Sequence, residues 1–389
     1  MRIQLGGRIA LEPYPELGGI VKELSPEKGR SGESADHYQD EKKMALINAE
    51  PNISHFMNYR AFAVKKKGNN IRSITAKHIE TGRELVFTAP LFADCTGDGT
   101  IGYLAGADYA MGRESKTEFG EPTAPEKSDS LTMGSTILWK SEEKDAPCSF
   151  PEFKYGMVFN ENNVQKEILG KWDWETGMNL NQITDFERIR DYGILAVYSN
   201  WSYLKNEYSE KDTFANRELG RVAYISGKRE SRRLLGDIIL KQQDIVDNVD
   251  YPDGTASTSW PIDLHYADPE NTKHFPGHEF KTIGVHQNIY PYPIPYRCFY
   301  SRNVDNLFMA GRNISVTHVA LGTVRVMRTT GMMGEVVGMA AAVCRQNNVK
   351  PRGVYEKHLE DLIALMKQGV GKYGTKPYPD YNLGAMKKR

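Results

Sequence analysis

The sequence lacks the cysteine patterns that would identify a metal site or a disulfide-bonded domain. Its four cysteines lie far apart, and none belongs to a Cys-x-x-Cys pair or a Cys/His pair with zinc or iron–sulfur spacing. We therefore expect no metal site, and a reducing compartment, by default the cytoplasm. The cysteines are Cys95, Cys148, Cys298 and Cys344.

Excess charge and long apolar runs are also missing. Lysine plus arginine and aspartate plus glutamate balance at 50 each in 389 residues, so no overall field favours nucleic acid or an anionic membrane. No apolar run approaches the roughly 20 residues that span a bilayer, and the first residues do not have the pattern of a signal peptide. We expect a small-molecule partner, without nucleic acid or membrane; nothing indicates the oligomeric state.

The segment from Asn306 to Gln346 is the most informative part of the chain. An apolar run of strand length, Leu307–Ala310, leads into a polar loop, and an apolar helix capped by Thr329 or Thr330 is expected to follow. Its glycines (Gly331, Gly334 and Gly338) favour a close approach by another backbone or a flat ligand, because glycine in a helix costs roughly 0.5–1 kcal/mol. A buried structural unit is the alternative reading.

A second glycine-rich turn follows the expected strand Pro90–Thr96. Residues Gly97–Gly102 match the dinucleotide pattern G-x-G-x-x-G before an expected helix, Ile101–Met111. A true fingerprint needs a second parallel strand that ends in an acidic residue about 20 positions on, and the charged, proline-rich stretch after Met111 does not supply one. The alternative to a turn that contacts a ligand is a purely structural strand-to-helix turn.

Hydrophobic spacing predicts the other elements. A helix is expected at Tyr38–Ala49, and four strands form a β-meander after it. The strands are Ile53–Asn58, Ala61–Lys66, Ile71–Ile79 and Glu84–Thr88. Further helices are expected at Gln182–Leu204 and Val354–Lys367, and residues 290–297 cannot be helical because of their prolines. Most tryptophans of the middle region should be core residues.

Charged residues from Tyr224 to Arg233 allow two interpretations. The run is either a solvated charged strand or a buried network of arginine and glutamate that borders a ligand. The histidines of the same region, His265 and His286, are in most such cases structural, although either imidazole could face a substrate.

Four segments together carry a family resemblance. NLFMAGRNIS with HVALGTVRVM (306–327), LFADCTGDGTIGYLAGA (91–107), SGKRESRRLLGD (226–237) and YPIPYRC (292–298) occur in the expected order. The chain resembles the FAD-dependent oxidoreductase family related to the heterodisulfide reductase A flavoproteins, from about Arg2 to about Lys367. The resemblance implies an α/β fold with a doubly wound FAD-binding domain at 1–107 and 300–367, an inserted α+β substrate domain at 108–299, and a tail at 368–389.

The resemblance begins in mid-motif. Nothing before Pro90 has the strand, the G-x-G-x-x-G turn and the helix of an FAD-binding domain in that order. We therefore expect the family's N-terminal strand–helix–strand unit to be absent from this chain. A chain of this kind should hold FAD weakly and expose an apolar sheet edge.

The resemblance also implies a set of site residues. Backbone and side chains of Thr96, Gly97, Asp98 and Gly99 and of Gly311, Arg312 and Asn313 are expected to contact FAD, with Gly331, Met332 and Gly334 at the helix end that faces the flavin ring. The resemblance to the family's RESRR segment favours the buried network for the charged run, with Arg229 and Arg232 on the substrate side. Position in the polar loop before the glycine-rich helix, rather than the resemblance, selects His318 to accept a proton and Arg325 to anchor the substrate. His265 and His286 are expected on the substrate side as imidazoles of the same region.

The predicted function is flavin-dependent oxidoreduction of a small organic molecule, with FAD as cofactor. Two alternatives stay open at this level. One is a non-catalytic remnant of a flavoenzyme, and the other is a carbohydrate-binding protein that uses the aromatic residues of the middle region. A visible spectrum separates a flavoenzyme from both.

Overall fold

The computed structural model describes residues 7–25 and 38–371, and these fall into two compact units. We call residues 130–230 and 264–285 the α5 unit, and the other described residues the α9 unit. The α9 unit thus also takes in residues 108–129, 231–263 and 286–299, which the sequence placed in the substrate domain. The sequence also suggests a possible short strand at Arg2–Leu5; this segment and most of the expected tail lie outside the described residues.

A pair of parallel strands stands at the centre of the α9 unit. Strand β4 (Phe92–Asp94) pairs with β17 (Leu307–Met309), so that Asp94 lies opposite Met309. Strand β17 is a short apolar run that is buried throughout, as expected for a strand covered on both faces. In β4, Phe92 and Asp94 are buried and Ala93 is exposed. Mixed α/β structure is confirmed, and β4 and β17 are the parallel strand pair among the residues that the structure describes.

Two helices follow β17, where the sequence predicted one. Residues 318–324 form helix α8 (His318–Val324), whose N-cap Thr317 accepts a hydrogen bond from the Ala320 amide at 3.1 Å. Helix α9 (Met327–Asn347) begins earlier than expected, so Thr329 and Thr330 lie inside it and do not cap it. The loop prediction for 318–324 was therefore wrong, because the capping threonine is Thr317.

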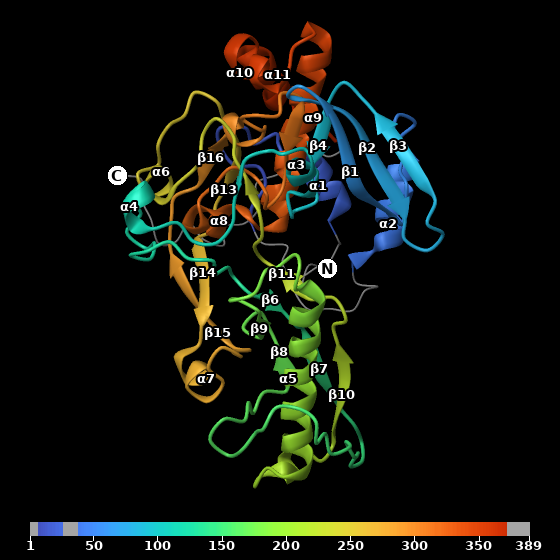
Figure 1. Cartoon of the computed structure of the whole chain (residues 1–389), viewed down its shortest axis with the longest axis vertical. Helices are drawn as coiled ribbons and strands as arrows, with labels where there is room; N and C mark the ends of the chain where they lie inside the picture. Colours follow the sequence, from blue (N-terminus) through green and yellow to red (C-terminus); the bar gives the residue numbers. More distant parts are fainter. Residues whose placement is uncertain (1–6, 26–37, 372–389) are drawn as a thin grey trace. The chain divides into compact units, whose positions relative to one another are not determined.

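Glycine in α9 does permit one close approach. Gly331 packs against Val21 of helix α1 (Gly19–Leu24), and a Cβ at Gly331 would lie 2.6 Å from Val21 Cγ2. Glu335 holds the same helix, because its carboxylate accepts hydrogen bonds from the amides of Gly18, Ile20 and Val21 at 2.7–3.1 Å. Figure 1 shows α1 beside α9.

An antiparallel meander forms the second sheet of this unit (Figure 1). Its strands are β1 (Tyr59–Lys67), β2 (Asn70–His78) and β3 (Glu84–Thr88), and helix α2 (Asp40–Asn48) precedes them. These four predictions are confirmed, whereas Ile53–Asn58 forms no strand. Helix α3 (Thr100–Leu104) is shorter than predicted. The single closing helix is two helices, α10 (Pro351–Lys357) and α11 (Leu359–Gln368), which break at His358.

The α5 unit is built around one long helix. Helix α5 (Phe186–Asn206) packs against strands β9 (Glu175–Thr176) and β10 (Arg217–Val222), and Figure 1 shows it beside β10. Its buried face packs into a core that includes Trp139, Trp174 and Trp201, all at most 3% exposed. The prediction that the tryptophans are mostly core residues is confirmed for these three.

The remaining strands and helices are short. In the α5 unit they are β6 (Ser135–Thr136), β7 (Trp139–Glu143), β8 (Leu169–Gly170), β9 (Glu175–Thr176), η2 (Lys211–Phe214), β10 (Arg217–Val222), β11 (Gly227–Lys228) and α7 (Pro269–His274). In the α9 unit they are β5 (Tyr109–Ala110), α4 (Lys116–Phe119), β12 (Arg233–Leu234), α6 (Gln242–Val246), β13 (Gly254–Thr258), β16 (Tyr292–Pro295) and η3 (Tyr296–Cys298). Strands β14 (Ile262–Ala267) and β15 (Thr282–Gln287) pair with each other.

Across residues 7–25 and 38–371, no helix is both long and apolar enough to cross a bilayer.

Candidate functional site

The loop after β4 is held in shape by a buried carboxylate. Asp94 Oδ1 accepts hydrogen bonds from the Thr96 amide at 3.0 Å and the Thr96 hydroxyl at 2.7 Å. Its Oδ2 accepts from the Gly102 amide at 2.9 Å, and Asp94 is fully buried. Thr96 Oγ1 in turn accepts from the Thr100 amide at 3.0 Å. These bonds fix the backbone from Thr96 to Gly102 before any ligand binds.

Two glycines in this loop adopt a backbone conformation that other residues rarely take. Gly97 has φ 72° and Gly99 has φ 60°, both in the left-handed region that favours glycine. A Cβ on Gly97 would come within 3.2 Å of Arg312 Nε. The turn therefore needs glycine for its conformation and for the approach of the Arg312 side chain.

The loop after β17 reaches the same place. Arg312 donates to Asp98 Oδ1 at 2.7 Å and to the Ser231 hydroxyl at 2.8 Å, and that hydroxyl donates to Asp98 Oδ1 at 2.8 Å. Because β4 and β17 are parallel, their carboxyl ends lie at one sheet edge, and ligands of α/β proteins bind outside such edges. The structure thus brings together two sets of predicted cofactor residues that are more than 200 positions apart in the sequence.

Asn313 supplies a buried polar atom at this edge. Its Nδ2 donates to the Asp94 carbonyl at 3.1 Å, while its Oδ1 is buried without a hydrogen-bond partner. Gly311 has φ 123°, and a Cβ there would come within 3.1 Å of that Oδ1. An orphaned buried acceptor costs about 1–3 kcal/mol, and a ligand hydroxyl or imide N–H would satisfy it. These residues therefore fit a cofactor such as FAD.

The α9 residues predicted at the helix end lie elsewhere. Because α9 begins at Met327, Gly331, Met332 and Gly334 belong to its second turn, where the backbone amides bond within the helix. Met332 is 1% exposed, and Gly331 faces α1. The helix start lies at Met327, and the Thr330 amide already donates to the Val326 carbonyl at 3.0 Å. The sequence misplaced the helix end by one turn.

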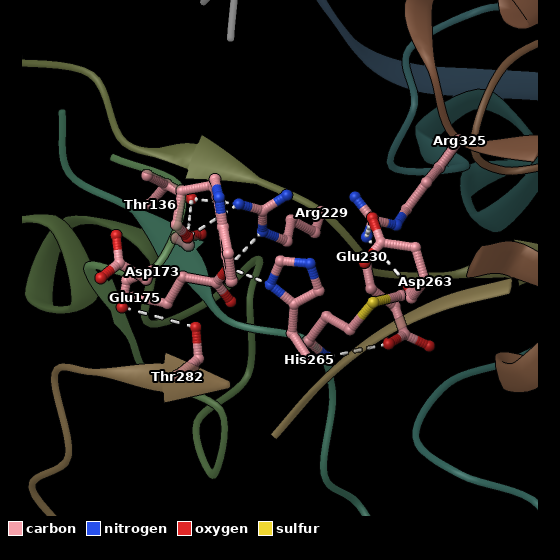
Figure 2. Close-up of polar contacts among 12 residues, drawn as sticks. Thr136, Asp173, Glu175, Arg229, Glu230, Asp263, His265, Thr282 and Arg325 are labelled. Carbon is pink, nitrogen blue, oxygen red and sulfur yellow. Dashed lines mark hydrogen bonds and ion pairs between the residues drawn. The ribbon is translucent and has the colours of Figure 1, made fainter. Parts of the chain in front are cut away.

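Arg325 bonds to a buried carboxylate at the start of α9. Its Nη2 donates to Asp263 Oδ2 and to the Asp263 carbonyl, each at 3.0 Å (Figure 2). The Trp260 indole donates to the same Oδ2 at 3.2 Å, and His286 Nε2 lies 3.0 Å from Oδ1. The structure therefore unites Arg325 and His286, both predicted, through Asp263, which was not predicted.

His318 lies at the other end of α8, buried beside acidic residues. It is 3% exposed, and its backbone amide donates to Glu114 Oε2 at 2.9 Å. Glu114 Oε1 pairs with the fully buried Arg233 at 2.6 Å. Arg325 follows His318 by seven positions along α8, so their Cα atoms lie about 10 Å apart along the helix axis. That both line one cavity stays a prediction.

Glu121 is a further buried carboxyl group near His318. Its Oε1 accepts from the Thr317 hydroxyl at 2.6 Å and from the Gln242 amide at 2.7 Å, and its Oε2 is buried without a partner. Burial raises the pKa of Glu121 above its ordinary value of 4.5; the two hydrogen bonds oppose this rise, and the charge of Glu114 adds to it.

This raised pKa predicts a loss of stability toward neutral pH. Because the folded protein holds the Glu121 proton more tightly than the unfolded chain, the free energy of unfolding falls as pH rises from about 4.5 through the raised pKa. The fall is at most about 1.4 kcal/mol per pH unit. Glu121→Gln should flatten this part of the plot of unfolding free energy against pH, measured by urea unfolding between about pH 4 and about pH 8. Exposed Glu118→Gln is the matched control, and an unchanged slope in Glu121→Gln would contradict the prediction.

The α5 unit holds a separate charged cluster. Arg229 Nε and His265 Nδ1 each lie 2.5 Å from Glu175 Oε1, and both side chains point at that carboxylate (Figure 2). Arg229 Nη2 also donates to the Thr136 hydroxyl at 2.8 Å and to the Trp172 carbonyl at 2.9 Å. All three charged residues are at most 5% exposed. The prediction of a buried network for the charged run is confirmed at Arg229.

Arg232 takes part in a different set of contacts, in the α9 unit. Its guanidinium carbon lies 3.7 Å from the ring centroid of Tyr103, and its Nη1 donates to the Asp98 carbonyl at 3.4 Å. Arg232 is therefore packed against the loop after β4 and supports it. The structure does not bring Arg232 together with Arg229.

Three acidic residues of these clusters were missed by the sequence analysis: Asp263, Glu175 and Glu121. None of the three belongs to a recognisable sequence motif. Asp263 lies in the segment WPIDLH (260–265), two positions before His265, which the sequence analysis named. That spacing was the available signal for Asp263. We find no comparable signal for Glu175 or Glu121.

Comparison with protein families gives one match. The model of the family described as FAD dependent oxidoreductase matches residues 35–363, which is most of the chain. Comparisons with curated proteins and with solved structures give no significant match.

Proposed function

Because the chain belongs to the FAD-dependent oxidoreductase family, we propose that it oxidises a small organic substrate by hydride transfer to FAD. FAD is the cofactor of the family, and flavin-based redox chemistry is its function. The flavin ring supplies the two-electron chemistry, while the protein binds, orients and provides charge. Hydride transfer and the kind of substrate are the parts that we propose.

The convergence of the loops after β4 and β17 is the observation that carries the cofactor assignment. We assign Thr96, Gly97, Asp98 and Gly99 as the backbone side of the site, and Gly311, Arg312 and Asn313 as its second side. Arg312 places a positive charge beside the glycine turn, which suits an anionic pyrophosphate. Asn313 Oδ1 is an acceptor without a partner and suits a hydroxyl of the ribityl chain.

Arg325 and His286 are the substrate-side residues that the α9 unit brings together, through Asp263. The Arg325 guanidinium is bonded to Asp263, so its role is to hold that carboxylate. His318 remains a predicted catalytic residue, although its burial means that a substrate must reach it through the protein interior. In the α5 unit, Arg229 and His265 remain proposed substrate residues.

Titration of the purified chain with FAD tests the proposal. We expect saturable quenching of flavin fluorescence, and Arg312→Met should weaken binding by about 10- to 100-fold, because one charge-assisted hydrogen bond contributes about 1.5–3 kcal/mol. Arg302→Met removes an exposed arginine that pairs with Asp108, and should leave the affinity unchanged.

Two results would contradict the assignment. Absence of saturable binding by the unmodified chain would remove the cofactor site. If the Arg312→Met variant binds FAD as tightly as the unmodified chain does, the loop after β17 is not part of the cofactor site. The same titration also tests the expectation that the chain holds FAD weakly. Tightly held, stoichiometric flavin would contradict that expectation but not the assigned cofactor site.

A further inference from the structure

We propose that Asp263 and His286 form an acid–base dyad in which His286 Nδ1 accepts the proton that the substrate loses during oxidation. The inference rests on the proposed function and adds a substrate class to it, because it requires an O–H or N–H group on the carbon that is oxidised. Neither residue belongs to a segment that carries the family resemblance.

Asp263 is positioned by two donors before it meets the histidine. It is 2% exposed, and Arg325 and the Trp260 indole both donate to its Oδ2. Its Oδ1 therefore faces His286 Nε2, at 3.0 Å. A buried carboxylate with one oxygen held by a guanidinium has its orientation fixed, and it in turn fixes the ring that it contacts.

His286 is the accessible imidazole among the predicted histidines. Its side chain is 47% exposed, whereas His265 is 5% exposed and His318 is 3% exposed. His286 Nε2 and Asp263 Oδ1 lie 3.0 Å apart, and a carboxylate is an acceptor only, so we expect the neutral ring to carry its proton on Nε2. The lone pair of the ring is then on Nδ1, at the far side from Asp263, where a substrate proton can be received.

The step balances in protons and electrons. Oxidation of an alcohol or amine removes a hydride from carbon and a proton from oxygen or nitrogen, and a C=O or C=N bond forms. Bound FAD would supply the two-electron acceptor for the hydride; the proton forms a new N–H bond at His286 Nδ1. The positive charge that develops on the ring lies against Asp263, which stabilises it as the carboxylate does in hydrolase triads. Arg325 Nη2 also lies 3.0 Å from this carboxylate, at Oδ2, and its positive charge stabilises the carboxylate.

The first test needs no substrate. Histidine-selective ¹⁵N labelling and NMR report which ring nitrogen carries the proton. We expect the neutral Nε2–H form for His286 in the unmodified chain, and a mixed population of both forms in Asp263→Asn, because an amide can donate as well as accept. His286→Gln assigns the signal. An unchanged His286 signal in Asp263→Asn would overturn the dyad, whether or not the chain binds FAD.

The second test uses activity. The FAD-loaded chain is mixed anaerobically with a panel of primary and secondary alcohols and amines, and bleaching of the oxidised flavin is followed. His286→Gln should slow bleaching by about 100-fold or more at saturating substrate, while flavin content and thermal unfolding stay as in the unmodified chain. Exposed His278→Gln should bleach at the unmodified rate.

The outcomes separate the dyad from the proposed function. If FAD binds and no alcohol or amine bleaches it, the substrate class is wrong. If bleaching occurs at equal rates in the unmodified chain and in His286→Gln, the flavoenzyme assignment survives and the dyad does not. Partial recovery of His286→Ala by added imidazole would support proton transfer at this position, because a purely structural role gives no such rescue.

Discussion

Arg229→Met is expected to lower the free energy of unfolding of the α5 unit by about 3–5 kcal/mol. The substitution removes the guanidinium that contacts Glu175 in a cluster where each charged residue is at most 5% exposed. Glu175 would then keep its buried negative charge without the guanidinium. Of the two side chains that contact its Oε1, Arg229 and His265, the histidine would remain. A buried carboxylate without its cation is far more costly than an exposed one.

Urea unfolding followed by tryptophan fluorescence measures this effect, because Trp139, Trp174 and Trp201 lie in the core of the same unit. Arg188→Met, on the exposed face of α5, is the matched control and should change stability by less than about 0.5 kcal/mol. The double variant Arg229→Met/Glu175→Gln should recover part of the loss, since it removes the stranded charge. A loss below about 1 kcal/mol in Arg229→Met would show that Glu175 does not depend on this partner.

Asp94→Ala is expected to abolish most FAD binding and to destabilise the α9 unit by about 2–4 kcal/mol. The variant leaves the Gly102 and Thr96 amides and the Thr96 hydroxyl without their shared acceptor. The buried Gly102 amide that loses its partner costs about 1–3 kcal/mol, and the two part-buried Thr96 donors add to this loss. The glycine turn would lose its fixed shape, so a ligand would have to order it on binding, which lowers affinity.

Asp94→Asn separates these contributions. Asparagine keeps one carbonyl oxygen for Thr96, but its amide cannot accept from Gly102, so stability and FAD affinity should fall between those of the unmodified chain and Asp94→Ala. FAD titration and urea unfolding of the three proteins give the comparison. Equal FAD affinity in all three would show that the loop after β4 takes no part in cofactor binding.

Sequence patterns predicted the helices and strands that are determined by the residues within them. The alternation of residues 61–88 and the turn at Gly68 were enough to locate β1, β2 and β3, and helical spacing located α5 within four residues of its start. Helix α8 was missed because HVALGTV (318–324) contains glycine, threonine and β-branched residues, which lower helix propensity. Its cap at Thr317 and its burial override that local preference.

Partners distant in the sequence could not be predicted from the residues alone. Glu175 lies 54 positions from Arg229 and 90 from His265, and no periodicity relates them. The buried-network interpretation of the charged run predicted carboxylate or backbone-carbonyl partners, because a buried charge must be paired and hydrogen-bonded. The sequence therefore predicted that Arg229 has a partner without identifying Glu175. The same holds for Arg325 and Asp263, which are 62 positions apart.

Glu335 has a consequence for how the α9 unit opens. Three amides at the start of α1 depend on this one carboxylate, and burial raises its pKa although those three hydrogen bonds oppose the rise. Short helices have little stability of their own. We therefore expect residues 18–24 to exchange their amide hydrogens as one group, released together when the Glu335 contact breaks, ahead of the amides in the middle of α9. The segment would then be a separate cooperative unit, with the start of α1 attached through the Glu335 side chain.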